Sequence, residues 1–326
     1  MRAVQFSRFG GPEVLDVVEV PTPRPRAGEV LVRVRAAGVN FFEALMRGDR
    51  YAVTPELPMI PGVEVAGEIA ALGEGVTGVA VGGRVAVPLF AFGRGTGGYA
   101  EFVAVDAAAV VPLPKAVSFE AAVALLVQGL TALHLVRHLP PGGRSVVVTA
   151  AAGGVGSLLL QLAKAEGAAR LIAVASSAEK RALAQRLGAD VAVDAAAPDW
   201  DVAVRVATGG AGADVVIDMV GGAQSPIARR ALASRGELVF GAMGRFALTP
   251  ADLDALLSEN QALRGFALLP LLTPENVHAD LAALFDRATR GGLEVIVGGR
   301  FALTDAAQAH RALESRGSVG KLVLVP

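Results

Sequence analysis

Residues 145–157 of this 326-residue chain read SVVVTAAAGGVGS. Ser145–Thr149 is a β-branched run typical of a buried strand, and the small residues after it allow a tight turn. Gly153 and Gly156 stand at the second and third glycine positions of the pattern G-x-G-x-x-G, with Ala151 at the first. This pattern, between a strand and a helix, predicts a dinucleotide site. We expect Gly153 to let the backbone approach a pyrophosphate and Gly156 to let helix and strand pack closely.

Short apolar runs alternate with helical patterns after this turn. Residues 170–176 are predicted as a strand, and residues 178–188 form an amphipathic pattern that ends at a glycine. Further strands are expected at 191–194, 214–221 and 236–244. Strands that are apolar throughout and alternate with helices indicate a parallel sheet covered on both faces. The sequence therefore predicts a doubly wound α/β domain of the Rossmann type at residues 119–266.

Residues 1–118 follow a different pattern. Three segments, 30–40, 63–73 and 82–90, alternate with a period of two residues and are separated by prolines. This pattern predicts an antiparallel β-rich barrel or sandwich. Residues 267–326 contain another helical pattern and end in the strand-like KLVLVP, which we expect to return to the first domain and complete a sheet edge.

Composition excludes several classes of protein. Hydrophobic residues make up 53% of the chain and charged residues 19%, which excludes a disordered chain. The net charge is −1, from 30 basic and 31 acidic residues without blocks, so no nucleic-acid or anionic membrane partner is expected. The absence of cysteine excludes disulfides, a thiolate nucleophile and Cys-ligated zinc.

The mean hydropathy of +0.50 calls for a search for membrane spans. The uncharged run 145–163 is long enough to span a bilayer, but its glycine turn divides it into a strand and a helix. The N-terminus, MRAVQFSRFGG, lacks the apolar region of a signal peptide. We therefore expect a cytoplasmic protein.

Two of the four histidines lie four residues apart. His134 and His138 would share one face of a helix, as metal ligands do, but no H-E-x-x-H pattern surrounds them and no third ligand is evident. We therefore interpret them as ordinary helix residues and expect no metal site.

The end of the second strand of the βαβ unit indicates which cofactor binds. An Asp or Glu about 20 residues after the glycine pattern would bind the ribose 2′-hydroxyl of NAD. Here Ser177 stands at that point, within SSAEKR. Hydroxyls and the cation of Lys180 can hold a 2′-phosphate, which a carboxylate would repel, so we expect NADPH. The alternative is that Lys180 is a solvated residue of the first helical turn, where cations are mildly disfavoured.

With these residues identified, the whole chain resembles the zinc-independent quinone oxidoreductase branch of the medium-chain dehydrogenase/reductase superfamily. The resemblance rests on GVNFFEALMRGDRY (38–51), PMIPGVEVAGEI (58–69), QGLTA (128–132), TAAAGGVG (149–156), SSAEKRALAQRLGAD (176–190) and RGSVGKLVLVP (316–326). In zinc alcohol dehydrogenases a cysteine ligand stands at the position of Asn40 and the histidine of a G-H-E motif at that of Val63. The resemblance therefore implies a GroES-like catalytic domain without zinc. It also implies hydride transfer to an acceptor that is already electrophilic, because no Lewis acid is present.

The resemblance also implies which residues contact the cofactor. Asn40 would lie near the nicotinamide, Thr131 near its ribose, and Arg316 would be a C-terminal contact. The phosphate turn would comprise Gly153, Gly154 and Val155, together with Gly156, and the 2′-phosphate pocket Ser177 and Lys180. Gly241 would begin a cofactor-binding loop after the fifth strand, and Phe266 and Leu268 would line the nicotinamide. Two positions depart from the family pattern, since Leu45 and Ala195 stand where tyrosines are frequent.

Three functions remain open at this point. The first hypothesis is an NADPH-dependent quinone reductase, which positions the nicotinamide beside a flat acceptor and takes protons from solvent. The second is a 2-enoyl thioester or alkenal reductase, in which Tyr51, eleven residues after Asn40, would donate a proton. Tyr51 as an aromatic wall of the pocket is the other interpretation of that residue. The third hypothesis is a non-catalytic NADPH-binding protein.

The candidate catalytic residues are accordingly Asn40 and Tyr51. Related enzymes assemble through the edge of the α/β domain, so the resemblance implies a homodimer or homotetramer.

Overall fold

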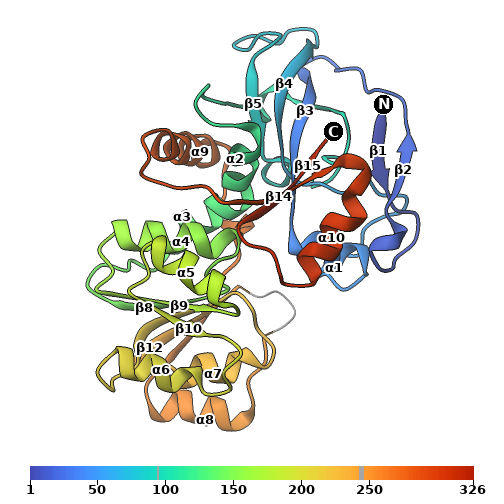
Figure 1. The fold of residues 1–326 in the computed structure, drawn as a ribbon. Coiled ribbons are helices and arrows are strands. Elements are labelled where there is room, and N and C mark those ends of the chain that lie inside the picture. The colour runs from blue at the N-terminus through green and yellow to red at the C-terminus, as the bar shows by residue number, and fades with distance from the viewer. Residues whose placement is uncertain (94, 242–245) are drawn as a thin grey trace. The chain divides into compact units, whose positions relative to one another are not determined.

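The computed structural model describes residues 1–93, 95–241 and 246–326 (Figure 1). The chain folds into two compact units. Met1–Leu130 and Leu271–Pro326 together form the first, which we call the β-rich unit. Thr131–Pro270 form the second, the α/β unit.

These units divide the chain later than the predicted domain boundaries at residues 118/119 and 266/267. Helix α2 (Phe119–Ala124) belongs to the β-rich unit because it packs against strands β3 (Glu29–Val39) and β4 (Val65–Leu72). At the other boundary, the α/β unit extends to Pro270.

The α/β unit contains a parallel sheet of six strands, as the apolar runs predict. In sheet order the strands are β10 (Val191–Asp194), β9 (Arg170–Ala175), β8 (Ser145–Thr149), β11 (Ala213–Asp218), β12 (Leu232–Phe240) and β13 (Ala262–Gly265). One face carries helices α3 (Leu130–His138), α4 (Gly154–Ala165) and α5 (Ala178–Arg186) (Figure 1). The other carries α6 (Trp200–Ala207), α7 (Gln224–Arg230) and α8 (Pro250–Ser258) (Figure 1). The strand order reverses between β8 and β11, the point at which such sheets bind ligands.

Two strands of this sheet differ from the prediction. The strand expected at 236–244 begins earlier, at Leu232, and ends at Phe240, while its predicted residues 242–244 lie outside the described residues. Strand β13 was not predicted, because ALRG is short and all four of its residues are exposed. The run 145–163 is a strand, a turn and a helix, as expected.

The β-rich unit is built on a seven-stranded sheet and a separate two-stranded ribbon. The sheet runs β14 (Val297–Ala302), β15 (Lys321–Val325), β3, β4, β5 (Arg84–Val87) and β7 (Val111–Pro112), with β6 (Phe102–Asp106) also paired with β3. The ribbon joins β1 (Arg2–Gln5) to β2 (Asp16–Glu19). The unit's other helices are α1 (Phe41–Arg47), α9 (Pro274–Thr289) and α10 (Ala306–Glu314). The short 3-10 helices of the described residues are η1 (Pro12–Val14), η2 (Leu89–Phe92), η3 (Ala107–Ala109), η5 (Leu269–Leu271) and η6 (Leu303–Asp305).

The last strand places the chain's C-terminal segment beside the start of α1. Strand β15 pairs antiparallel with β3, so that Leu322 lies opposite Val39, the residue before Asn40. This pairing brings Lys321, the residue that precedes Leu322, to the segment from which Asn40 projects.

A π-helical segment, η4 (Leu125–Gly129), joins α2 to α3. Together they form the helical run Phe119–His138, which is long and apolar enough to cross a membrane by length and composition. Of its most apolar window, 72% is buried inside the protein, as in the core helix of a water-soluble fold. No other helix of the described residues passes this test.

Candidate active site

The glycine turn in the α/β unit leaves room for a ligand beside the start of α4. Gly153 precedes the helix in an extended conformation, and the helix's first N–H groups have no acceptor within the helix itself. A Cβ on Gly153 would meet a single neighbouring atom, the carbonyl oxygen of Ala150 at 3.1 Å. The open space here, next to a helix dipole that favours negative charge, fits a pyrophosphate.

Gly156 has a different role in the same turn. A Cβ at Gly156 would lie 2.7 Å from the Cα of Ala151 and would collide with the carbonyl oxygen of Ala150. A side chain there would push α4 away from the end of β8. This contact explains the third glycine of the pattern, while Gly154 and Val155 form the intervening first turn of α4.

Ser177 and Lys180 lie together at the start of α5. Ser177 is the N-cap, and its hydroxyl accepts a hydrogen bond from the Lys180 N–H at 3.3 Å. The Glu179 N–H and the Ser177 hydroxyl both hydrogen-bond the Glu179 carboxylate and lower its pKa. The Lys180 side chain is half-buried, and this burial lowers the pKa of its ammonium. Ser177 therefore also caps α5, a role that the sequence analysis did not assign to it. The signal was present, because serine is a preferred residue immediately before a helix.

Gly241 and Phe266, both expected near the cofactor, follow neighbouring strands of the sheet. The N–H of Gly241, after β12, bonds the carbonyl of Asp218 at 3.0 Å. The N–H of Phe266, after β13, bonds the carbonyl of Phe240 at 3.0 Å. These residues therefore lie at the carboxyl edge of the sheet, while Leu268 follows half-buried and Thr131 is buried in α3.

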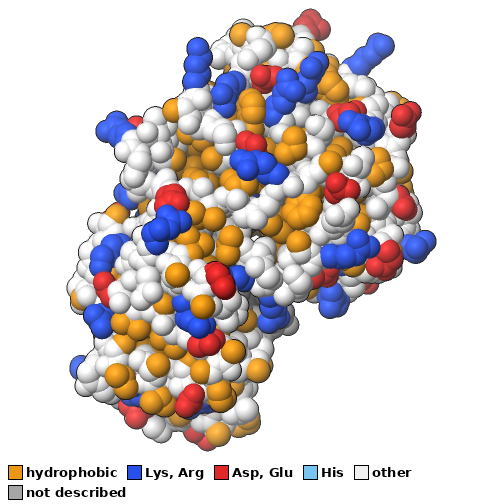
Figure 2. All heavy atoms as spheres, in the orientation of Figure 1, with side chains coloured by type: hydrophobic (Ala, Val, Ile, Leu, Met, Phe, Trp, Pro, Cys, Tyr) orange, Lys and Arg blue, Asp and Glu red, His pale blue; other side chains and the backbone are white. Residues whose placement is uncertain are grey.

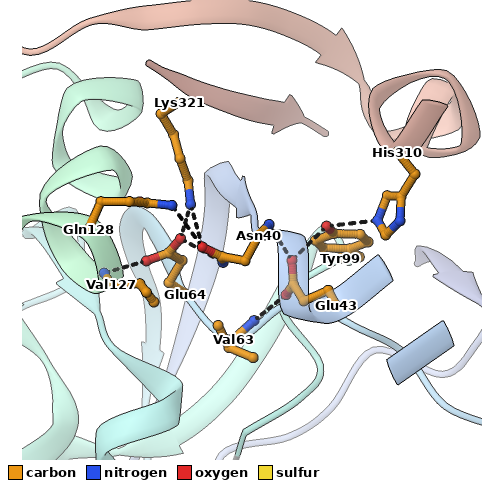
Figure 3. Close-up of polar contacts among 9 residues, drawn as sticks. All are labelled: Asn40, Glu43, Val63, Glu64, Tyr99, Val127, Gln128, His310 and Lys321. Carbon is orange, nitrogen blue, oxygen red and sulfur yellow. Dashed lines mark hydrogen bonds and ion pairs between the residues drawn. The ribbon is translucent and has the colours of Figure 1, made fainter. Parts of the chain in front are cut away.

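A buried polar cluster surrounds Asn40 in the β-rich unit (Figure 3). Asn40 Nδ2 donates to Glu64 Oε1 at 2.9 Å. Asn40 Oδ1 accepts from Lys321 Nζ at 2.8 Å and from Gln128 Nε2 at 2.9 Å. Lys321 also forms an ion pair with Glu64, whose other oxygen accepts from the Val127 N–H at 2.8 Å. We call Asn40, Glu64, Gln128 and Lys321 the Asn40 cluster; none of the four is more than 9% exposed.

Several elements of the β-rich unit meet to form the Asn40 cluster. Glu64 precedes β4, Lys321 begins β15, and Gln128 lies in the π-helical segment η4, a type of helix distortion frequent at functional sites. Gly38 leaves the space that the Lys321 and Glu64 side chains occupy, because a Cβ there would lie 2.6 Å from the Lys321 Cε and would also collide with Glu64. Removing one partner of a buried ion pair typically costs about 3–5 kcal/mol, so the pair stabilises this arrangement only as a unit.

A second buried carboxyl group holds the backbone of Asn40. Glu43 Oε2 accepts from the Asn40 N–H at 2.7 Å and from the Tyr99 hydroxyl at 3.0 Å, and Oε1 accepts from the Val63 N–H at 3.1 Å. Burial raises the pKa of Glu43 to about 7, while the hydrogen bond from Asn40 acts in the opposite direction.

The hydrogen bonds continue from Tyr99 through His310 to Arg47. Arg47 Nη1 lies 2.8 Å from His310 Nδ1, and His310 Nε2 lies 3.2 Å from the Tyr99 hydroxyl. Arginine can only donate, so Nδ1 accepts and Nε2 carries the proton that is donated to Tyr99. Burial and the adjacent Arg47 lower the pKa of His310 to about 3, consistent with this neutral ring. Arg47 is in turn bound by both carboxylate oxygens of Glu314, at 2.9 and 3.0 Å.

The remaining predicted residues lie on the same unit. Tyr51 is half-buried, with its ring 5.7 Å from that of Phe42, and burial raises the pKa of its phenol. Arg316 is exposed just after α10, with a positive φ of 57°. Sequence reasoning missed Glu64, Gln128, Lys321, Glu43, Tyr99 and His310 as members of buried polar networks.

The histidine pair predicted as ordinary helix residues lies on α3. The two rings stack with centroids 5.9 Å apart, and His138 Nδ1 lies 3.0 Å from the His134 carbonyl oxygen. Within the described residues, no group of three or more His, Asp or Glu side chains could hold a metal ion.

Comparison with known proteins assigns families to both parts of the chain. Residues 26–115 match the family model described as an alcohol dehydrogenase GroES-like domain, and residues 154–287 match that of a zinc-binding dehydrogenase. A quinone oxidoreductase of Pseudomonas aeruginosa is 36% identical over 332 residues, which cover 100% of this chain and 99% of the relative.

Solved structures agree with these relatives. The Escherichia coli quinone oxidoreductase complexed with NADPH is similar with a TM-score of 0.90 and 31% identity, over 100% of both chains. A mycobacterial protein complexed with NADPH is similar with a TM-score of 0.89 and 37% identity, again over 100% of both chains.

Proposed function

We propose that this chain, which belongs to the quinone oxidoreductase branch of the medium-chain dehydrogenase/reductase superfamily, is an NADPH-dependent quinone reductase. The observation that carries the proposal is the phosphate turn at the switch point of the parallel sheet, in a chain that matches NADPH-complexed relatives over its whole length. In this proposal the start of α4 binds the pyrophosphate and Lys180 the 2′-phosphate.

The reaction needs little acid–base chemistry from the protein. Bound NADPH supplies a hydride, which the quinone takes up with one proton from water to give hydroquinone and NADP⁺. The protein's part is to hold nicotinamide and acceptor together and to place hydrogen-bond donors where charge develops. The buried amide of Asn40 is the candidate donor in the β-rich unit.

We propose further that the enzyme works without zinc. By resemblance, the positions of two zinc ligands hold Asn40 and Val63, and the chain has no cysteine. The Asn40 cluster already contains a cation, the ammonium of Lys321, bound to both Asn40 and Glu64. A second cation among these groups would be repelled, so the residues present do not fit a zinc ion.

The second candidate is reduction of an activated double bond, as in a 2-enoyl thioester or alkenal. The observation in its favour is Tyr51, a half-buried phenol whose pKa is raised by burial, so that it keeps its proton at neutral pH. Such a group suits the proton donor that this reaction needs and quinone reduction does not.

We also propose a cytoplasmic homodimer or homotetramer that acts on a small molecule. Strand β13 is the last strand of the sheet and its residues are exposed, so its outer edge can pair with a second copy. Figure 2 shows acidic and basic side chains interspersed over the face drawn, which supports a small-molecule substrate over a nucleic acid. Light scattering should give a multiple of the 33.2 kDa chain mass, and a monomer would contradict the assembly.

The function is tested by following NADPH oxidation with benzoquinone and, in parallel, with a short 2-enoyl thioester. We expect faster turnover with the quinone, less than about one zinc per chain and no effect of a chelator. Faster turnover with the thioester would favour the second candidate. NADPH binding without oxidation of either acceptor would favour a non-catalytic protein, and chelator-sensitive turnover would contradict the zinc-free proposal.

A further inference from the structure

The amide of Asn40 is held by three side chains whose hydrogen-bonding roles differ (Figure 3). We propose that Lys321, Glu64 and Gln128 fix this amide with one N–H left as a donor, and that this N–H binds the acceptor oxygen that gains negative charge during reduction. The inference rests on the proposed quinone reduction and adds to it a defined role for Asn40 and a positioning role for Lys321 and Glu64.

The orientation of the amide follows from the chemistry of its neighbours. The Lys321 ammonium can only donate a hydrogen bond, so the atom 2.8 Å from it must be the amide oxygen. The Glu64 carboxylate, ion-paired with Lys321, can only accept, so the atom 2.9 Å from it must be the amide nitrogen. A flipped amide would face two mismatched charges.

A hydrogen-bond count shows what the cluster lacks. Asn40 Oδ1 has both lone pairs occupied, by Lys321 and Gln128. One N–H of Nδ2 is bound to Glu64, and among the described residues the structure gives the other no acceptor. Gln128 must turn its Nε2 toward the Asn40 oxygen, and its own buried Oε1 has no partner among the same residues.

The two unsatisfied atoms belong to side chains joined by a 2.9 Å hydrogen bond, so one small polar ligand could satisfy both. A carbonyl oxygen accepts from the Asn40 N–H, and the hydroxyl formed on reduction can also donate to Gln128 Oε1. Quinone reduction converts a carbonyl oxygen into a hydroxyl, so one oxygen could make both contacts in turn. Unsatisfied buried polar groups are costly, which favours a ligand that completes them.

The chemistry balances without a proton from Asn40. The quinone gains the two electrons and one hydrogen of the hydride, one of its oxygens becomes anionic, and water protonates that oxygen to give hydroquinone. The Asn40 N–H is a fixed donor to this oxygen throughout. Because Lys321 polarises the amide from its oxygen side in a buried site, the donor is preorganised for the developing charge.

A double variant that exchanges the amide and the carboxylate tests the donor. Asn40→Asp with Glu64→Gln keeps the net charge and leaves a carboxylate to bind Lys321 and Gln128, but removes the amide donor from position 40. We expect kcat with benzoquinone to fall about 10²–10³-fold, as for loss of an oxyanion-hole donor. The dissociation constant for NADPH should change less than about threefold, because the phosphate contacts proposed at the start of α4 and at Lys180 are retained. A threefold change corresponds to only about 0.65 kcal/mol.

The matched control removes the ion pair and keeps Asn40. In Glu64→Gln with Lys321→Met the amide of Asn40 remains, but only Gln128 and the glutamine introduced at position 64 can orient it. Because both of these partners are amides that can donate or accept, they tolerate either orientation of Asn40. We expect kcat to fall less, about two- to tenfold, because part of the population still presents the N–H. An equal loss in both double variants would overturn the donor assignment.

Nuclear magnetic resonance supplies a readout independent of turnover. The chain has three asparagines, Asn40, Asn260 and Asn276, so selective ¹⁵N-amide labelling gives three side-chain NH₂ groups with two proton signals each, and the Asn40→Asp substitution identifies one pair. With NADP⁺ present, benzoquinone should shift one Asn40 Nδ2 proton and leave the proton bound to Glu64 nearly unchanged. Asn276, whose Nδ2 donates to the Leu271 carbonyl at 2.8 Å, is the internal reference.

The outcomes separate the inference from the proposed function. Benzoquinone turnover with an unshifted Asn40 signal, or a folded Asn40→Asp/Glu64→Gln variant within about threefold of the wild-type kcat, overturns the donor assignment. A wild-type protein that reduces only the 2-enoyl thioester overturns quinone reduction instead. The same titration with the thioester then decides the donor role.

Discussion

The two units position the polar groups proposed to bind ligands in different ways. In the α/β unit the phosphate turn is one contiguous segment, 150–156, and its chemistry comes from backbone N–H groups at the start of α4. In the β-rich unit the Asn40 amide is bound by side chains that lie 24, 88 and 281 residues away in the sequence. The first arrangement depends on close backbone packing, and the second on the tertiary fold of the whole unit.

This difference predicts different responses to substitution. A change in the turn should act through sterics on the nearest strand and on the cofactor. A change in the Asn40 cluster should act through charge and hydrogen bonding, with effects that depend on the partner residues.

Gly156→Ala should destabilise the α/β unit and prevent NADPH binding. The added Cβ would lie 2.7 Å from the Ala151 Cα and collide with the Ala150 carbonyl oxygen, neither of which can rotate away. Overpacking of this kind costs about 1–3 kcal/mol or more. Urea unfolding and cofactor titration measure the two effects.

Gly153→Ala is the matched control for this prediction. Its Cβ meets one atom, at 3.1 Å, so the variant should fold nearly as well as the wild type and lose affinity for NADPH through the blocked ligand space. Equal unfolding free energies for Gly156→Ala and the wild type would contradict the packing role of the third glycine.

Lys180→Ala should weaken NADPH binding roughly ten- to a hundredfold and leave NADH nearly unchanged. A charge-assisted hydrogen bond contributes roughly 1.5–3 kcal/mol, and NADH lacks the phosphate that would receive it. Lys164→Ala is the control, because Lys164 lies on α4 of the same unit and binds Asp190 at 2.7 Å. If Lys180→Ala weakens both cofactors equally, the 2′-phosphate lies elsewhere.

The same contrast explains which parts of the structure could be predicted from the sequence. The parallel sheet and its glycine turn were predictable because strands, turn and helix are local patterns in residues 145–188. Strand β13 was not, because an exposed edge strand of four residues carries no hydrophobic pattern.

The Asn40 cluster was only partly predictable, through the resemblance that singled out Asn40. Glu64 precedes an alternating strand and has the appearance of its solvent-facing residue, yet it is fully buried. Lys321 likewise opens an apolar strand at a position where a charged flank is ordinary. Their burial becomes evident only when β15 pairs with β3. The one sequence signal was the scarcity of lysine, of which the chain has four.

Glu43→Gln should change how stability depends on pH. Burial raises the pKa of Glu43 from 4.5 to about 7, so in the wild type this group's contribution is present below pH 4.5 and is lost as the pH rises through about 7. The variant lacks this loss. As the pH rises through this window, its unfolding free energy should therefore increase relative to that of the wild type by about 1.4 kcal/mol per pH unit. Urea unfolding at several pH values measures the difference.

His310 gives the opposite sign and a check on the same network. Its pKa is lowered from 6.5 to about 3, so its contribution is present above pH 6.5 and is lost as the pH falls toward 3. His310→Gln should therefore gain on the wild type as the pH falls. A difference between Glu43→Gln and wild type that does not vary between pH 4.5 and about 7 would show that burial does not raise the pKa of Glu43.

Tyr51→Phe should have the smallest effect, and it separates the two enzymatic candidates. The substitution keeps the ring that lies 5.7 Å from Phe42 and removes only the hydroxyl. With benzoquinone we expect kcat to change less than about tenfold, because water supplies the proton and hydride transfer needs no phenol.

If Tyr51 is instead the proton donor for a 2-enoyl thioester, the same variant should lose about 10²–10⁴-fold in kcat with little change in KM, as for an interaction made only in the transition state. Measuring kcat and KM with both acceptors, for the wild type and for Tyr51→Phe, distinguishes these two outcomes. A large loss with the thioester, together with wild-type turnover faster on the thioester than on any quinone, would replace quinone reduction by double-bond reduction as the function of this chain.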